Sequence, residues 1–161
     1  MDVLQVKIAD LQAARNSGLL ITVGLGSCLG VSLYDAQNKV AGLAHILLAD
    51  SKPFKENGRF GNPAKFVDTA IPLLMKKMTA LGGIPEKFVA KIAGGSQIFY
   101  SANNLSNIGE KNIKAARKIL DFYQVPIVGE DVGGNYGRTM RLFVNSGRVL
   151  ISTAGKGERE I

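Results

Sequence analysis

The sequence has only one cysteine, one histidine and no tryptophan among its 161 residues. A single cysteine cannot form an internal disulfide, which favours a cytoplasmic location over a secreted one. No apolar run is long enough to cross a membrane, so direct membrane insertion is not expected. The first residues also lack the basic start and the small-residue cleavage site of a signal peptide.

The formal net charge is +7, which suits an anionic partner, either a nucleic acid or an acidic protein surface. The basic residues are spread along the chain, and aromatic residues do not alternate with them as they do in proteins that stack bases. No nucleic-acid partner is therefore expected, and a basic coating of the surface is the favoured interpretation. One cysteine and one histidine supply at most half of a tetrahedral zinc site, so no metal is expected.

The composition, with 46% hydrophobic and 20% charged residues, is typical of a globular protein. The length predicts a single domain over residues 1–161. The polar segment 154–161 is expected to be a flexible tail.

The order of apolar patterns predicts an α+β fold, with a mainly antiparallel sheet and two helices packed on it. A polar segment over residues 50–61 is predicted to be a long loop, either functional or a plain surface connection. The strands are expected at residues 3–9, 19–23, 29–34, 40–48, 87–93, 126–130, 139–144 and 148–152.

The first helix is expected to begin with Asn62 as its N-cap and Pro63 at its first position, and to end near Leu81. Pro72 lies inside this pattern, so it should kink the helix or leave its first part irregular. The second helix is expected over residues 108–123. Its inward-facing side chains are predicted to be Ile113, Ala116, Leu120 and Tyr123.

Cys28 and His45 lie on two consecutive predicted strands. A two-residue turn at residues 36–37 would place Cys28 directly opposite His45, with Cβ atoms about 4.5–5.5 Å apart. A turn centred on residues 38–39 is equally plausible and gives a different register.

A cysteine beside a histidine is a candidate nucleophile and base. If the imidazole pairs with the Cys28 thiol, the pKa of that thiol should fall below about 8.5. A buried structural cysteine is as common, and a lone histidine on an apolar strand is more often a core residue. From the residues alone both interpretations stay open.

Three further residues could assist such a nucleophile. Thr22 lies on the strand before the glycine-rich turn, where its hydroxyl could orient the imidazole, although a plain β-branched strand residue is the default interpretation. Gly26 lets the backbone turn sharply near the sulfur, and the backbone amides of Ser27 and Cys28 are candidate donors to an oxyanion. The glycine-rich segment 133–137 lacks the ending of a phosphate-binding loop and is interpreted as a tight loop near the active edge.

Several sequence blocks, taken together, resemble the chemoreceptor glutamine deamidase family, CheD. They cover most of the chain from about residue 18 to 150, and the Gly-Ser-Cys block with its following histidine is the most specific. The blocks are residues 21–28, 42–45, 90–95, 107–112 and 130–138.

The resemblance implies a cysteine hydrolase that deamidates glutamines on the cytoplasmic helices of methyl-accepting chemotaxis receptors, with glutamyl methyl ester hydrolysis in some members. Cys28, His45 and Thr22 match the family's catalytic residues, and no cofactor is implied. The fold would be a layered α/β sandwich with a mixed sheet and its helices on one side, similar to the cytotoxic necrotizing factor deamidases.

The resemblance also implies binding to a CheC-type phosphatase, so a regulatory binding module is the alternative function. Two features depart from the family pattern. Pro72 affects only the regularity of the first helix. The segment Gln97-Ile98-Phe99 contains apolar residues that are expected to influence partner binding, with Phe99 as the candidate contact.

Overall fold

The structure is a computed structural model that describes residues 1–97 and 107–161. Its strands form two five-stranded sheets, with the orders β1-β3-β8-β9-β10 and β2-β5-β4-β6-β7. The pairs β1/β3 and β6/β7 are parallel, and the other pairs of named strands are antiparallel. The strands are β1 (Val3–Gln5), β2 (Asp10–Arg15), β3 (Leu19–Leu25), β4 (Leu29–Asp35), β5 (Val40–Ile46), β6 (Val89–Gly94), β7 (Ile127–Val132), β8 (Arg138–Phe143), β9 (Val149–Thr153) and β10 (Gly157–Glu160).

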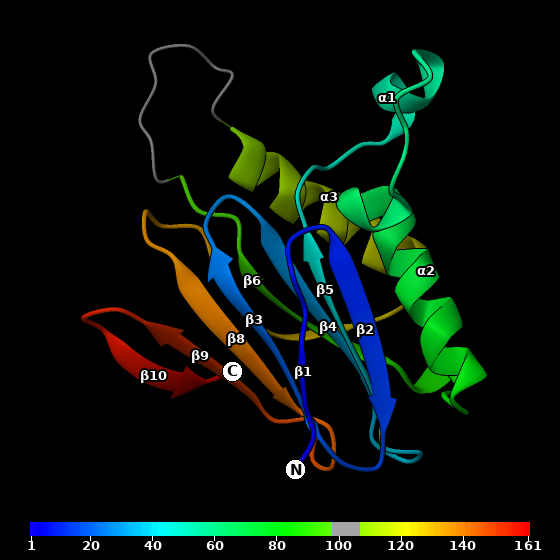
Figure 1. The fold of residues 1–161 in the computed structure, drawn as a ribbon, viewed down its shortest axis with the longest axis vertical. Coiled ribbons are helices and arrows are strands. Elements are labelled where there is room, and N and C mark those ends of the chain that lie inside the picture. Colours follow the sequence, from blue (N-terminus) through cyan, green and yellow to red (C-terminus); the bar gives the residue numbers. More distant parts are fainter. Residues whose placement is uncertain (98–106) are drawn as a thin grey trace.

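The elements form three layers, because the two sheets lie face to face and two helices cover the outer face of the second sheet (Figure 1). These helices are α2 (Val67–Ala80) and α3 (Ile108–Phe122). The α+β class and the helices on one side of a sheet are therefore confirmed. The division of the strands into two sheets was not expected.

Two inner strands of the second sheet, β4 and β5, are buried along their whole length because this sheet is covered on both faces. Leu29, Val31 and Leu33 of β4 pack into the core beneath the helices. Tyr34 of β4 and Leu43 of β5 pack into the core between the sheets. Alternate residues of each strand thus serve the two cores, and odd-numbered β5 residues such as His45 face the first sheet.

The prediction of one strand over residues 3–9 is wrong, because β1 ends at Gln5. The chain forms β1, turns at Ala9, whose φ is +58°, and continues as β2 in the other sheet. Strand β2, which was not predicted, pairs with β5 from Asp10 to Arg15.

The first predicted helix is divided into two. Asn62 caps a short 3-10 turn, Pro63–Lys65, by accepting a hydrogen bond from the backbone N–H of Ala64. Phe66 is extended, and α2 begins only after it. Pro72 lies inside α2, which is one helix from Val67 to Ala80. The predicted loop 50–61 contains a short helix, α1 (Lys52–Glu56).

The second predicted helix is confirmed as α3, with Ala116 and Leu120 buried on its inner face. The inward position predicted for Tyr123 is wrong, since this residue caps the helix and is 37% exposed. The expected flexible tail over residues 154–161 instead contains β10, which pairs with β9.

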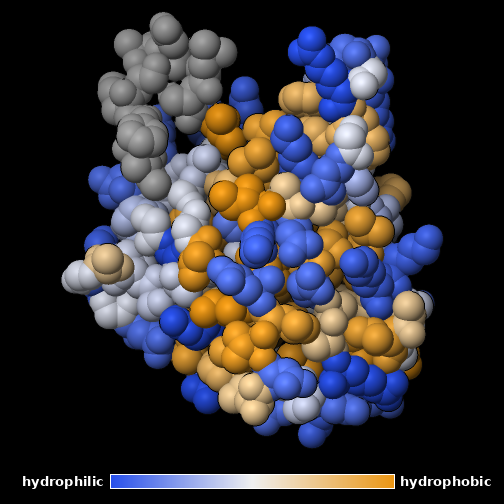
Figure 2. Space-filling view, in the orientation of Figure 1, coloured by the Kyte–Doolittle hydropathy of each residue, from blue (hydrophilic) through white to orange (hydrophobic). Residues whose placement is uncertain are grey.

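Among the described residues, no helix combines the length and the apolar character needed to span a bilayer. Figure 2 shows hydrophobic side chains gathered over the middle of the face on which β1 and β3 lie, with hydrophilic ones between them. The exposed apolar residues of these segments include Val3 and Val23, which are 59% and 48% exposed.

Candidate active site

Cys28 lies in the turn that carries the chain from β3 in the first sheet to β4 in the second. Its side chain is 7% exposed and packs into the core between the sheets. The backbone carbonyl groups of this turn accept hydrogen bonds from other segments of the chain. The Gly26 oxygen accepts from the Ser96 N–H at 2.8 Å, and the Cys28 oxygen accepts from the Gly95 N–H at 2.9 Å.

The carbonyl between these two is held by a side chain, because Asn112 Nδ2 donates to the Ser27 oxygen at 2.9 Å. In contrast, no acceptor for the N–H of Ser27 or Cys28 is found within residues 1–97 and 107–161. The carbonyl groups of the turn are thus bound, whereas these two N–H groups are available to donate to a developing oxyanion.

His45 lies on β5 and is fully buried. The prediction that Cys28 is its direct partner is wrong, since Gly30 is opposite His45 and Leu29 is opposite Ile46. Cys28 therefore lies two residues further along, diagonal to His45. Diagonal neighbours in a regular ladder are about 7–8 Å apart, still within reach of a long or aromatic side chain.

The register differs because the connection between the strands is longer than either predicted turn. Asp35 pairs with Val40, and residues 36–39 form the loop. The Asp35 carboxylate stabilises this loop by accepting from the backbone N–H groups of Gln37 and Asn38 at 3.0 and 3.1 Å. The shift from the predicted register is two residues, so His45 keeps the predicted face.

Thr22, fully buried on β3, brings its Oγ1 to 2.7 Å from His45 Nδ1. The same hydroxyl donates its only hydrogen to the Val6 carbonyl oxygen, also at 2.7 Å. The hydroxyl must therefore accept from the imidazole, which puts the ring proton on Nδ1. His45 Nε2 is then a lone-pair nitrogen, and it has no hydrogen-bond partner among the described residues.

Burial sets the protonation of both residues. It raises the pKa of the Cys28 thiol above its ordinary value, and the Cys28 N–H offsets this only in part by stabilising the thiolate. Burial lowers the pKa of His45. Burial thus opposes the expected lowering of the thiol pKa, and both directions favour a neutral thiol and a neutral imidazole at pH 7.

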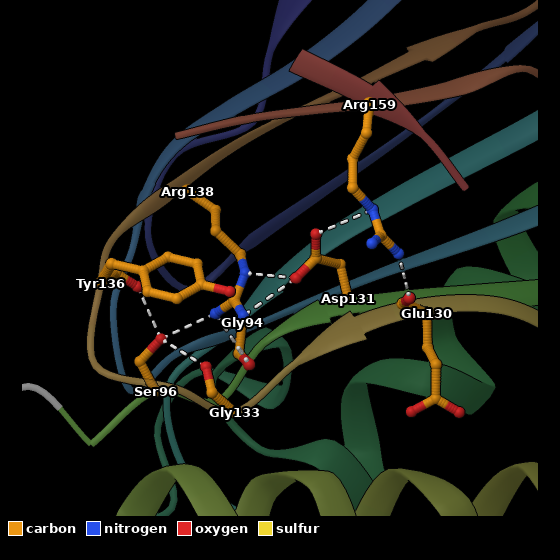
Figure 3. A network of polar contacts seen from close by, with 8 residues as sticks. All are labelled: Gly94, Ser96, Glu130, Asp131, Gly133, Tyr136, Arg138 and Arg159. Atoms are coloured by element: carbon orange, nitrogen blue, oxygen red, sulfur yellow. Dashed lines mark hydrogen bonds and ion pairs between the residues drawn. The ribbon is translucent and has the colours of Figure 1, made fainter. Parts of the chain in front are cut away.

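A polar network holds the segment that supports the Cys28 turn (Figure 3). Arg138, which is 2% exposed, donates from Nη1 to Ser96 Oγ at 2.7 Å and to the Gly94 oxygen at 3.4 Å. Its Nε and Nη2 each lie 3.0 Å from Asp131 Oδ1. Ser96 Oγ in turn donates to the Tyr136 oxygen at 2.7 Å.

The glycine-rich segment 133–137 forms the other side of this network. Gly133 donates its N–H to the Gly94 oxygen at 2.9 Å, and the Tyr136 ring lies 4.4 Å from the Arg138 guanidinium carbon. Gly94 has a φ of +102°, and a Cβ there would collide with the Cys28 carbonyl oxygen. The segment thus supports the residues that bind the Cys28 turn, which agrees with a tight loop near the active edge.

The structure brings together Thr22 and His45, with Gly26, Ser27 and Cys28 in the adjoining turn. Phe99, the expected partner contact, lies outside the described residues. Three residues that hold the turn were not among the predicted site residues: Ser96, Asn112 and Arg138. Ser96 follows a glycine pair, and Asn112 and Arg138 end the sequence blocks 107–112 and 130–138, but none of these signals indicated that the residues hold the turn.

Cys28 and His45 do not line the cavity of about 650 Å³ that borders Gly24, Arg138 and Glu158. Within the described part of the chain, no group of three or more histidine, cysteine or acidic residues is placed to hold a metal ion.

A family model and several full-length relatives of this chain all have the name CheD. A family described as CheD chemotactic sensory transduction matches residues 47–153. A protein of Caldanaerobacter subterraneus subsp. tengcongensis is 44% identical over 161 residues, which cover 99% of this chain and 98% of that protein. A protein of Clostridium novyi is 46% identical over 162 residues, with the same two coverages. A protein of Desulforamulus reducens is 47% identical over 154 residues, which cover 94% of this chain and 91% of that protein.

Each of these three relatives has the name "Probable chemoreceptor glutamine deamidase CheD". The family match begins after His45, whereas the relatives align over almost the whole chain. The solved structure of Neisseria meningitidis protein NMB0706 is similar at a TM-score of 0.45 and 13% identity, covering 84% of this chain and 63% of that one. A likeness at that level supports no further comparison.

Proposed function

The chain belongs to the CheD family, and on that premise we propose that it is a cysteine-dependent amidohydrolase that converts glutamine side chains of chemoreceptors to glutamate. The names of its relatives support the substrate and the type of reaction. The residues Cys28, His45 and Thr22 are proposed as the catalytic set.

The first half of the reaction forms a thioester. Cys28 Sγ attacks the side-chain amide carbon of the glutamine while His45 Nε2 accepts the thiol proton. The negative charge that develops on the amide oxygen is stabilised by the backbone N–H groups of Ser27 and Cys28. When the C–N bond breaks, His45 returns the proton to the leaving nitrogen, and ammonia departs.

The second half hydrolyses the thioester. His45 Nε2 accepts a proton from a water molecule, whose oxygen attacks the thioester carbon. The C–S bond breaks, the proton returns to sulfur, and the product is a glutamate side chain. A glutamyl methyl ester would follow the same steps with methanol as the leaving group. This chemistry needs no cofactor.

The observation that best supports the proposal is the hydrogen-bond chain from His45 to Thr22 and on to Val6. It leaves the lone pair of His45 on Nε2, a nitrogen with no partner among the described residues. A merely structural core histidine would have both ring nitrogens satisfied. The low exposure of Cys28, 7%, suits a slender side-chain amide rather than a bulky ligand.

The test is incubation with a chemoreceptor cytoplasmic fragment, followed by mass spectrometry for the gain of about one dalton per converted glutamine. The wild-type protein should convert specific glutamines, and Cys28→Ala should convert none. Ser32→Ala is the matched control, because Ser32 is 2% exposed on β4 but bonds only to Lys91 among the described residues. Conversion by a folded Cys28→Ala protein would exclude the proposed nucleophile.

A CheC-type phosphatase is proposed as a regulatory partner, on the strength of the family resemblance alone. A cytoplasmic location follows from the same proposal, because receptor glutamines of this kind lie on cytoplasmic helices. If partner binding were the main function, Cys28→Ala would bind the phosphatase as the wild type does while losing deamidation. Measuring both activities on one preparation separates the two functions.

A further inference from the structure

Asn112 is a fully buried polar residue in the second turn of α3. Its side-chain nitrogen donates to the Ser27 oxygen at 2.9 Å and to the Leu47 oxygen at 3.1 Å. Both amide hydrogens are thus bound to backbone carbonyls, which also fixes which end of the amide is nitrogen. The other end, Oδ1, is buried without a hydrogen-bond partner among the described residues.

This arrangement is costly for fold stability alone. Asparagine is a poor helix former, and an unpaired buried oxygen loses its hydration without compensation. The rest of the buried face of α3 is apolar or small, with Gly109, Ala116 and Leu120. A polar residue at this one position therefore needs a reason beyond packing.

The two carbonyls that Asn112 binds belong to the two segments of the active site. Ser27 directly precedes the nucleophile Cys28, and Leu47 lies two residues after the base His45 on the continuation of β5. One side-chain amide therefore ties the turn of the nucleophile to the strand of the base, from a helix that contributes neither.

The bond to Ser27 also sets the direction of a backbone donor. In a trans peptide the C=O and the following N–H point in opposite directions. The Ser27 carbonyl points at Asn112, so the Cys28 N–H points away from that side chain. Burial raises the pKa of the Cys28 thiol, and this N–H partly offsets the rise by bonding the thiolate, which agrees with that direction.

We propose that Asn112 is a positioning residue that aims the Cys28 N–H at the reacting sulfur and oxyanion and keeps the Cys28 turn in register with the strand of His45. The proposal rests on the proposed function for its catalytic consequence. The orientation of the Cys28 peptide does not depend on the proposed function.

The experiment replaces Asn112 with leucine, which has a similar shape and no donors. We measure kcat and KM on a chemoreceptor cytoplasmic fragment, and the rate of Cys28 alkylation by iodoacetamide between pH 7 and 10, each per folded protein. Misaiming one oxyanion donor should lower kcat by about 10- to 100-fold with KM changed less than about threefold. Alkylation at pH 8 should slow by about three- to tenfold, as expected when a hydrogen bond to the thiolate is lost.

The matched control is Ala116→Gly, one helical turn further along the same buried face. This change loosens α3 without removing a contact to the turn, so kcat and alkylation should equal those of the wild type. If Asn112→Leu matches Ala116→Gly in both measurements, Asn112 is only structural and the proposal is overturned. If Asn112→Leu does not fold, Asn112→Ala is judged by the same criteria.

The two proposals fail in different ways. If the wild-type protein converts no glutamine in any receptor fragment, the proposed function is wrong. The alkylation comparison then decides the role of Asn112 by itself, since an unchanged profile overturns the inference and a slowed one upholds it.

Discussion

Thr22 Oγ1 and His45 Nδ1 lie 2.7 Å apart across the space between the two sheets, and the hydrogen between them belongs to the imidazole. The threonine hydroxyl has already given its hydrogen to the Val6 carbonyl. A neutral residue thus fixes the tautomer of His45, the proposed base. Because the hydroxyl has no charge, it stabilises an imidazolium less than a carboxylate would. In the proposed mechanism, attack on the substrate must therefore drive the transfer of the thiol proton to His45.

Replacing Thr22 with valine keeps the shape of the side chain and removes the hydroxyl. Losing a neutral hydrogen bond costs about 0.5–1.5 kcal/mol, so kcat should fall by about two- to thirteenfold while the protein stays folded. Thr22→Ser should recover much of the rate. Steady-state kinetics with circular dichroism measure both effects. A folded, fully active Thr22→Val protein would assign the orienting role elsewhere.

The stability of the protein should decrease as the pH falls below about 6.5, because of His45. Burial lowers the pKa of His45 in the folded state below its value in the unfolded chain, near 6.5. The unfolded state then binds the proton first. The stabilisation is complete above the unfolded pKa and is lost as the pH falls through the folded one, at up to about 1.4 kcal/mol per pH unit.

Urea denaturation at pH 7.5, 6.5, 5.5 and 5.0 measures this loss, and His45→Gln is its control. Asp35 and Glu130 also have shifted pKa values, but both are lowered, so the stability they contribute is lost mainly below about pH 5. The wild type should lose stability between pH 6.5 and 5.0, whereas His45→Gln should not. Equal slopes for the two proteins would show that His45 does not titrate in this range.

The thiol of Cys28 should remain protonated until the pH exceeds the ordinary cysteine value of about 8.5. Desolvation raises its pKa more than its backbone N–H lowers it, and no cation within the described residues is among the causes of its shift. Alkylation by iodoacetamide should therefore rise only above that pH in the free protein. A midpoint of the alkylation rate below about pH 8.5 would indicate a preformed thiolate–imidazolium pair. The variant His45→Gln should then move that midpoint back to about 8.5 or above.

The sequence predicted those parts of the fold that depend on local patterns. The apolar patterns over residues 29–34 and 40–48 predicted β4 and β5, and those over residues 139–144 and 148–152 predicted β8 and β9. Cys28 and His45 stood out because each is the only residue of its type. Thr22 was singled out by the family resemblance, since a threonine on a strand has no distinguishing pattern.

The parts that the sequence did not predict depend on contacts between distant segments. The register of β4 and β5 depends on how the Asp35 carboxylate binds its loop, and hydrophobic alternation does not report loop length. Strand β10 is polar and forms only because β9 offers it an edge. Asn112 and Arg138 hold the Cys28 turn from positions more than 80 residues away in sequence, which no local pattern encodes.

Two arginines pair with consecutive acidic residues, one in the interior and one on the surface. Arg138 has a fully buried side chain and pairs with Asp131, whereas Arg117 pairs with Glu130 at 2.6 Å on the surface, with both side chains more than 40% exposed. Arg138→Met should lower the free energy of unfolding by about 3 kcal/mol, the low end for breaking a buried pair, because Arg159 still lies 3.3 Å from Asp131.

Arg117→Met removes the same charge and adds the same side chain, yet it should cost less than about 1 kcal/mol, since exposed pairs contribute little. Guanidinium denaturation of both variants makes the comparison. Arg138→Met should also slow deamidation, because Arg138 holds Ser96, whose N–H binds the Gly26 carbonyl beside the nucleophile. Similar stability losses for the two variants would mean that the network of Figure 3 does not support the turn. Normal deamidation by a folded Arg138→Met protein would show that the network stabilises the fold but does not affect the reaction.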